Sequence, residues 1–223
     1  IWVFGKRGKF DLFHILDHSY SQLVHVLDSR RVLVTCHDLD TFRCLLNPEE
    51  TPAGFVFRGM THHVLSGFRK SHRVTCDSQS TLDDILRHDL LPADKLSLCQ
   101  MGVSSEFFRA ASINPVPGRL RLLHVGSTIA RKRIDVLLKV YSKVRKRIPG
   151  CELIRIGGPL SSEQESLARN LGILDAITTL ENISETELVK SFADATLLLQ
   201  PSDAEGFGLP VVEAMAAGTP VLV

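Results

Sequence analysis

Residues 200–223 read "QPSDAEGFGLPVVEAMAAGTPVLV" and follow an apolar run that is typical of a buried strand. Pro210 is suited to the first turn of a helix, because its fixed φ fits that turn and its missing N–H would have no partner there. Gly206 and Gly208 allow the backbone to turn tightly and to approach a ligand closely. The segment therefore predicts a strand, a turn and a helix whose amino terminus can hold an anion such as a diphosphate.

Two carboxylates flank this turn, Glu205 before it and Glu213 one turn into the helix. Because like charges repel, neither carboxylate is expected to share the phosphate pocket. Glu213 can accept hydrogen bonds from the two hydroxyls of a ribose, and Glu205 can accept them from a sugar. The pattern is suited to a nucleotide sugar whose diphosphate lies between the two acids. The alternative interpretation is an ordinary strand–turn–helix with glutamates on its surface.

The rest of the chain alternates short apolar segments with helical patterns. Strands are predicted over residues 10–16, 31–35, 73–75, 95–98, 120–125, 152–156 and 195–199. Helices are predicted over 134–148, over 162–171 before the C-cap Gly172, and after a capping box at 184–187. This alternation is typical of α/β proteins with parallel sheets that helices cover on both faces.

Composition and charge narrow the class of protein. A net charge of +1 gives no reason to expect a nucleic-acid partner. No apolar run reaches the roughly 18 to 20 residues of a membrane span. The five cysteines are scattered, odd in number and without a C-x-x-C pair, which favours reduced thiols over disulfides or a zinc site. We expect a cytoplasmic protein and leave open a peripheral association with the inner face of the membrane.

The irregular stretch "RAASINPVPGR" at residues 109–119 holds two prolines and a glycine, and it is predicted to separate two α/β halves. The predicted domains are 1–110 and 119–223, with a linker at 111–118. The first half lacks its opening strands and the second lacks its last elements. We therefore expect both ends to be truncated, and the chain to be a fragment that is not a competent catalyst by itself.

The C-terminal stretch resembles the signature of the group-1 family of retaining glycosyltransferases. That signature has a Pro-Ser pair, an E-G-F-G-L-P turn, a second Glu eight residues after the first, and E-A-M-A-x-G-x-P-V. The stretches "LHVGSTIARKRIDVLL", "CELIRIGG" and "FADATLLLQPS" resemble the family's nucleotide-binding domain, in order. "LVTCHDL" and "LCQMGVSSEFF" resemble parts of its first domain, so the resemblance covers nearly the whole chain. It implies the GT-B fold, in which two Rossmann-like domains with parallel sheets face each other across a cleft.

The loop "GSTIARKR" lies between a predicted strand and a predicted helix. The family offers an arginine just after the glycine and a lysine further on, both to the donor phosphates. Lys132 matches the lysine, but Ser127 stands at the arginine position and Arg133 at a position where glycine is usual. Arg131 or Arg133 could supply the second charge. The alternative is a solvated basic loop.

The resemblance implies a set of residues that bind the nucleotide sugar. Its predicted members are Gly126, Ser127, Arg131, Lys132, Arg133, Gly157, Gly158, Gly206, Phe207, Gly208, Leu209 and Glu213. The candidate catalytic residues are His37, Glu205 and Lys132. His37 would lie near the reacting sugar and position the donor, unless it only makes a structural hydrogen bond at the strand end. His18 would face the cleft or be structural, and His62 and His63 would lie at the surface or pack on the acceptor side.

The predicted function is transfer of a sugar from a nucleoside-diphosphate sugar to an acceptor hydroxyl, with retention at the anomeric carbon. The resemblance implies chemistry that needs no metal, and the sequence agrees, because no D-x-D-type motif stands in a plausible loop; no cofactor is expected. The resemblance also implies that the leaving phosphate takes the acceptor proton. The absence of G-x-G-x-x-G weighs against a dinucleotide oxidoreductase. Two alternatives stay open: another GT-B enzyme such as an epimerase or phosphorylase, and a non-catalytic nucleotide-sugar-binding module. The sequence leaves the acceptor, the sugar and the base open.

Overall fold

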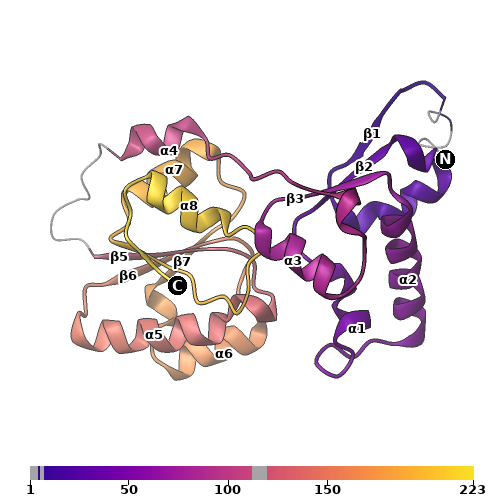
Figure 1. The fold of residues 1–223 in the computed structure, drawn as a ribbon. Coiled ribbons are helices and arrows are strands. Elements are labelled where there is room, and N and C mark those ends of the chain that lie inside the picture. The colour runs from indigo at the N-terminus through magenta and orange to yellow at the C-terminus, as the bar shows by residue number, and fades with distance from the viewer. Residues whose placement is uncertain (1–4, 6–7, 112–119) are drawn as a thin grey trace. The chain divides into compact units, whose positions relative to one another are not determined.

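A computed structural model describes residues 5, 8–111 and 120–223 (Figure 1). The chain forms two compact units, Ile1–Met101 and Gly102–Val223. Each unit has its own parallel sheet, and each is described by itself.

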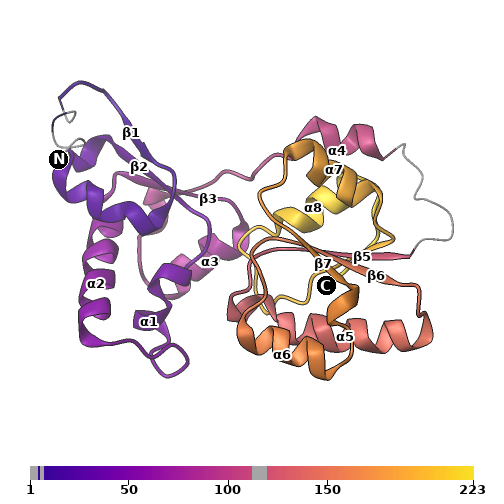
Figure 2. The same cartoon turned by 180° about the vertical axis from the view of Figure 1, so that it is seen from behind.

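The first unit contains four parallel strands in the order β1-β2-β3-β4. They are β1 Phe13–Ile15, β2 Val32–Cys36, β3 Arg73–Cys76 and β4 Leu96–Leu98. Its α-helices are α1 Arg43–Leu46, α2 Phe55–Lys70 and α3 Gln79–Arg87, and its 3-10 helices are η2 His18–Val26, η3 Ser29–Arg31, η4 Asp40–Phe42 and η5 Ala93–Lys95. Helix α2, which Figure 2 shows from behind, packs directly on η2, since a Cβ at Gly67 would clash with the carbonyl of Ser21.

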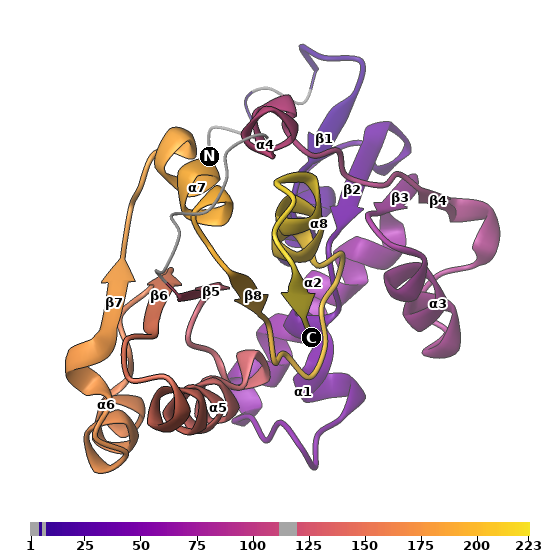
Figure 3. The same cartoon turned by 90° about the vertical axis from the view of Figure 1, so that its left-hand side faces the viewer.

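The second unit contains five parallel strands in the order β7-β6-β5-β8-β9. They are β5 Arg121–Val125, β6 Glu152–Ile156, β7 Ile177–Leu180, β8 Leu197–Leu199 and β9 Val221–Leu222. Its helices are α4 Ser105–Ala110, α5 Ile134–Arg147, α6 Ser162–Asn170, α7 Glu185–Ala193 and α8 Leu209–Ala216, with 3-10 helices η6 Ala130–Lys132 and η7 Leu174–Ala176. Figures 1 and 3 show α5 and α6 on one side of this sheet and α7 and α8 on the other. The helices thus cover both faces, as parallel sheets require.

The strand order of the second unit contains a switch point between β5 and β8. From β5 the chain crosses through α5 to β6, and from β8 it crosses through α8 to β9 on the other face. The loops that follow β5 and β8 therefore diverge from neighbouring strand ends. In open α/β sheets this is where a crevice forms and where ligands bind.

The structure confirms the predicted α/β class and the local signals read from the sequence. The capping box of Ser184 and Glu187 is present in both directions. Gly172 adopts a left-handed φ of 66°, as a C-cap glycine does. Strand β1 begins at Phe13, later than the predicted residue 10, because its pairing with β2 begins only there. Helix α5 begins at the predicted Ile134 and ends at Arg147.

The domain boundary lies earlier than the predicted residue 110. Helix α4 belongs to the second unit, where Phe107 and Ala110 are buried in the core. The ring of Phe107 meets that of Phe192 edge-on, with centroids 5.4 Å apart. The apolar face of α4 is thus part of the second core. The sequence analysis placed the boundary after α4, because the irregular stretch with its prolines and glycine begins there. The predicted linker lies almost entirely outside the described residues.

Among the helices of the described residues, none combines the length and the apolar character that crossing a membrane requires.

Candidate functional site

The loops that follow β5 and β8 meet at the switch point of the second unit. The amide of Asp203 donates to the carbonyl of Arg131 at 2.9 Å, which joins the two loops. Lys132, on η6, is 8% exposed and extends toward the β8 loop. Its Nζ lies 2.6 Å from Oε1 and 2.8 Å from Oε2 of Glu205. Two candidate catalytic residues that are far apart in the sequence are therefore directly paired.

Glu205 receives further donors. Arg131 Nη1 lies 3.3 Å from Oε2, and Gln200 Nε2 lies 3.1 Å from Oε1. Burial by itself would raise the pKa of Glu205, but the hydrogen bonds from Lys132 and Gln200 and the charge of Lys132 lower the pKa to about 2. The sequence predicted Lys132 for the donor phosphates and Glu205 for a sugar, and the structure without a ligand pairs the two side chains with each other. The carboxylate is anchored on the ammonium group, because opposite charges meet where the two loops join.

Arg133 pairs with aspartates, whereas Arg131 and Lys132 pair with Glu205. Its backbone is left-handed, with φ 47° and ψ 47°, which explains why glycine suits this position. A left-handed residue with a Cβ costs about 1–2 kcal/mol. Arg133 Nη1 donates to Asp203 Oδ1 at 2.8 Å, and Nε donates to Asp135 Oδ1 at 3.1 Å. Of the two candidate second cations, the structure thus pairs Arg133 with aspartates and places Arg131 beside Lys132.

The glycines allow the loops to approach one another closely. Gly157 has φ 142°, and a Cβ there would clash with the carbonyl of Gly126. Gly208 is the N-cap of α8 with φ 76°, so the predicted glycine turn before the helix is confirmed. Ser127 is exposed on the β5 loop, and Phe207 is half-buried on the β8 loop. All the predicted nucleotide-sugar residues of this unit therefore lie on the carboxyl-end loops or the first turns of α8.

Glu213 lies on α8 and is 9% exposed. Burial, and to a smaller extent the nearby Glu185, raise its pKa to about 7. Within residues 5, 8–111 and 120–223, no group donates a hydrogen bond to its carboxyl. Such a carboxyl changes its charge near neutral pH and has its hydrogen-bonding capacity available for a ligand.

In the first unit, His37 directly follows β2. Its Nε2 lies 2.8 Å from the carbonyl oxygen of Leu16, and its Nδ1 is hydrogen-bonded to Oδ2 of Asp77. Sequence analysis missed Asp77, which directly follows β3 and lies two residues after the end of the predicted strand 73–75. The carboxyl ends of neighbouring parallel strands share one edge, and this was the available signal. His18 is 3% exposed between the rings of Phe42 and Phe68, so it is a core residue.

His62 and His63 lie exposed on α2, as predicted. The ring of His63 stacks on that of His25 with centroids 4.4 Å apart. Among the described residues, no group of three or more His, Cys, Asp or Glu side chains has the geometry to hold a metal ion.

Sequence analysis also missed a buried polar pair beneath the loops of the second unit. His124 on β5 and Arg155 on β6 are register partners, and neither is exposed. Arg155 Nη1 donates to the carbonyl of Gly158 at 3.3 Å. Burial, together with the charges of Arg155 and Lys132, lowers the pKa of His124 to about 3, so the imidazole is neutral. The polar residue in each strand was the available signal.

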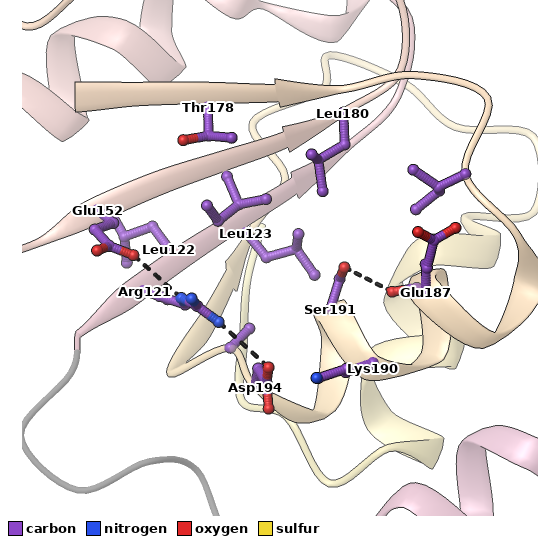
Figure 4. A pocket seen from close by; sticks show the side chains of 13 residues that line it. Arg121, Leu122, Leu123, Glu152, Thr178, Leu180, Glu187, Lys190, Ser191 and Asp194 are labelled. Carbon is purple, nitrogen blue, oxygen red and sulfur yellow. Dashed lines mark hydrogen bonds and ion pairs between the residues drawn. The ribbon is translucent and has the colours of Figure 1, made fainter. Parts of the chain in front are cut away.

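A hollow of about 440 Å³ lies between α7 and the face of the same sheet formed by β5, β6 and β7 (Figure 4). Arg121 lines it and donates to Glu152 at 3.2 Å and to Asp194 at 3.3 Å. Arg121 and Glu152 are the first residues of their strands. The lining residues of the hollow come from β5, β6, β7, α7 and the turns at the two ends of α7, and the Arg121–Glu152 pair joins the amino ends of β5 and β6.

Comparison with known proteins places this geometry in a family. The family model described as "Glycosyl transferases group 1" matches residues 107–223. A D-inositol 3-phosphate glycosyltransferase of Streptomyces scabiei is 30% identical and aligns with 99% of this chain and 54% of its own length. An MMP alpha-(1->4)-mannosyltransferase of Mycolicibacterium hassiacum is 31% identical over 65% of this chain and 35% of its own. The chain spans about half the length, or less, of these curated relatives.

Solved structures agree on the fold. A sucrose-phosphate synthase of Thermosynechococcus elongatus has a TM-score of 0.75 at 22% identity, over 97% of this chain and 57% of that one. HepE of Anabaena, solved in complex with UDP, has a TM-score of 0.69 at 17% identity, over 99% of this chain and 61% of that one. WaaG, a glycosyltransferase of lipopolysaccharide biosynthesis, has a TM-score of 0.69 at 18% identity, over 97% and 60%. With its two parallel sheets of the GT-B type and a family match over more than half of its length, the chain belongs to the group 1 glycosyl transferases.

Proposed function

We propose that the protein transfers a sugar from a nucleoside-diphosphate sugar to an acceptor hydroxyl, with retention at the anomeric carbon. The observation that carries this proposal is the pairing of Lys132 with Glu205 at the switch point, beside the amino terminus of α8. At this point a cation that can bind a diphosphate is directly hydrogen-bonded to a carboxylate that can bind sugar hydroxyls. Membership of the group 1 glycosyl transferases supports the same reaction class.

In the proposed reaction, Lys132 and Arg131 neutralise the diphosphate as its bond to the sugar breaks. The amides at the start of α8, around Phe207 and Leu209, add the positive end of the helix. Glu213 accepts the ribose hydroxyls, and Glu205 accepts hydroxyls of the donor sugar. These groups supply the positive charge from the chain itself, so we propose a reaction that needs neither metal nor cofactor.

The pairing seen here gives the proposal a further step. A diphosphate that binds Lys132 would replace Glu205 as the partner of the ammonium group. Glu205 would then turn toward the sugar, and the lysine would exchange one anion for another. A buried charge left without a partner costs several kcal/mol, so such an exchange keeps the site stable with and without the donor.

The first test concerns the phosphate contact. Replacing Lys132 with Ala should weaken binding of a nucleoside diphosphate by about 1.5–3 kcal/mol, the range for hydrogen bonds to charged groups. Isothermal titration calorimetry measures the change. Lys139→Ala is the matched control, because Lys139 pairs with Asp135 at 3.3 Å on the exposed side of α5. Equal affinities of the Lys132 variant and the unchanged chain would rule out the assignment.

The second test concerns the reaction. We expect a chain extended to the length of its relatives to release nucleoside diphosphate from one member of a nucleotide-sugar panel only when an acceptor is added. The 223-residue chain assayed beside it should bind the nucleotide but turn over less. Conversion of the sugar nucleotide without acceptor would indicate an epimerase. Binding without turnover in both chains would indicate a binding module.

A further inference from the structure

Both ring nitrogens of His37 are engaged at the carboxyl edge of the first sheet. Cys36 and Cys76 are register partners at the ends of β2 and β3, so the residues that follow them, His37 and Asp77, lie side by side. Nδ1 of His37 is hydrogen-bonded to Oδ2 of Asp77, and Nε2 lies 2.8 Å from the carbonyl oxygen of Leu16. The side chain of His37 is 43% exposed, whereas that of Asp77 is 6% exposed.

The chemistry of these partners determines the protonation of the ring. A carbonyl oxygen can only accept a hydrogen bond, so Nε2 must carry a hydrogen. An ionised carboxylate also only accepts, so Nδ1 must carry one as well. In a neutral imidazole one ring nitrogen has no hydrogen, and its lone pair would face the lone pairs of the oxygen beside it, which is repulsive. The doubly protonated imidazolium is the form that satisfies both contacts.

The charged groups around His37 favour this form. Burial would lower the pKa of His37, but the hydrogen bond and charge of Asp77, the Leu16 carbonyl and the charge of Asp17 raise it above its ordinary value. Asp38 is the next residue along the chain. His18 adds no opposing charge near neutral pH, because burial lowers its pKa. The surroundings of the ring are thus acidic.

The backbone of His37 is held as firmly as its ring. Thr81, on α3, donates its hydroxyl to the carbonyl of His37 at 3.2 Å. The ring is fixed through β1, β3 and the end of its own strand. A side chain held at both ring nitrogens, on a backbone held by Thr81 and with part of its surface exposed, presents its charge in one place.

We propose that Asp77 is a positioning residue that keeps His37 as a fixed imidazolium, so that His37 acts as a cation and not as a proton acceptor. The role in sugar transfer rests on the proposed function, in which this charge would stabilise an anionic group such as a phosphate of a bound substrate. The protonation state itself rests only on the geometry of the first unit.

Nitrogen-15 NMR of histidine-labelled chain tests the protonation state without any substrate. At pH 7 both ring nitrogens of His37 should carry hydrogens, and the signal is assigned by its loss in His37→Gln. In Asp77→Asn the titration midpoint should fall by at least one pH unit, which is about a tenfold weaker proton affinity. Asp17→Asn is the matched control, because Asp17 lies nearby but caps Ser19, and it should move the midpoint less.

Two results would overturn the proposal: a bare ring nitrogen on His37 at pH 7, or an unchanged midpoint in Asp77→Asn. The first needs only the unchanged chain, so misfolding of a variant does not prevent a decision. In the extended chain, Asp77→Asn should shift the alkaline limb of kcat/KM to lower pH, and Asp77→Glu should restore part of it. A purely structural role would lower activity equally at all pH values. If the NMR result holds and no transfer is detected, the proposed function falls and the imidazolium stands.

Discussion

Glu205→Gln should bind a free nucleoside diphosphate more tightly than the unchanged chain while losing sugar transfer by about 10²–10³-fold, the loss seen when a preorganised contact to a reacting group is removed. The reason is the pairing with Lys132, whose ammonium is held by both carboxylate oxygens at 2.6 and 2.8 Å. A neutral amide competes less for the cation than a carboxylate does. In the variant the diphosphate no longer competes with a carboxylate for Lys132, so we expect the affinity for the nucleoside diphosphate to rise by up to about tenfold, or 1.4 kcal/mol. The sugar loses a strong acceptor for its hydroxyls.

Calorimetry with the nucleoside diphosphate and a transfer assay with the sugar donor, both on the extended chain, separate the two effects. Asp203→Asn is the matched control, because it removes a carboxylate from the same loop that pairs with Arg133 instead of Lys132. Its nucleotide affinity should change less than that of Glu205→Gln. Weaker nucleotide binding in Glu205→Gln would contradict the proposed exchange of anions on Lys132.

Glu213→Gln should stabilise the fold at pH 8 and leave it unchanged at pH 4. In the unfolded chain Glu213 loses its proton near pH 4.5, whereas in the folded chain it does so at about 7. Between these values the unfolded state binds fewer protons, so the free energy of unfolding falls as the pH rises through this window. At about 1.4 kcal/mol for each pH unit, the variant should gain up to about 3 kcal/mol at pH 8. At pH 4 the protonated carboxyl and the amide are equally neutral.

Chemical denaturation of both chains across pH 4–8 measures this difference, and stability curves that stay parallel would refute the raised pKa of Glu213. Glu185→Gln should reproduce a small part of the gain, because Glu185 adds to the shift. Nucleotide affinity provides a second readout. It should rise from pH 6 to pH 8 in the unchanged chain, because the ribose hydroxyls donate best to a carboxylate, and it should be weak and flat in Glu213→Gln.

The sequence by itself determined the features that depend on a few neighbouring residues. The α/β class followed from apolar periodicity, the start of α8 from Pro210 and Gly208, and the start of α7 from the capping box at Ser184. These signals act through backbone dihedrals and local hydrogen bonds, so no distant partner is needed to predict them. The turn at residues 205–209 was found for the same reason, whereas the other candidate site residues came from the resemblance to a known family.

Only the tertiary structure decided which of these residues touch one another. Strand β8 pairs with β5 although β6 and β7 lie between them in the sequence, and this places Glu205 on Lys132. The pairing of His37 with Asp77 likewise depends on the register of β2 against β3. Helix α4 joins the second core because Phe107 packs on Phe192, which lies far from it in the sequence. Strand order and register are set by the packing of the whole chain. An ion pair between residues on two different strand-end loops therefore cannot be predicted from the spacing of residues within one segment.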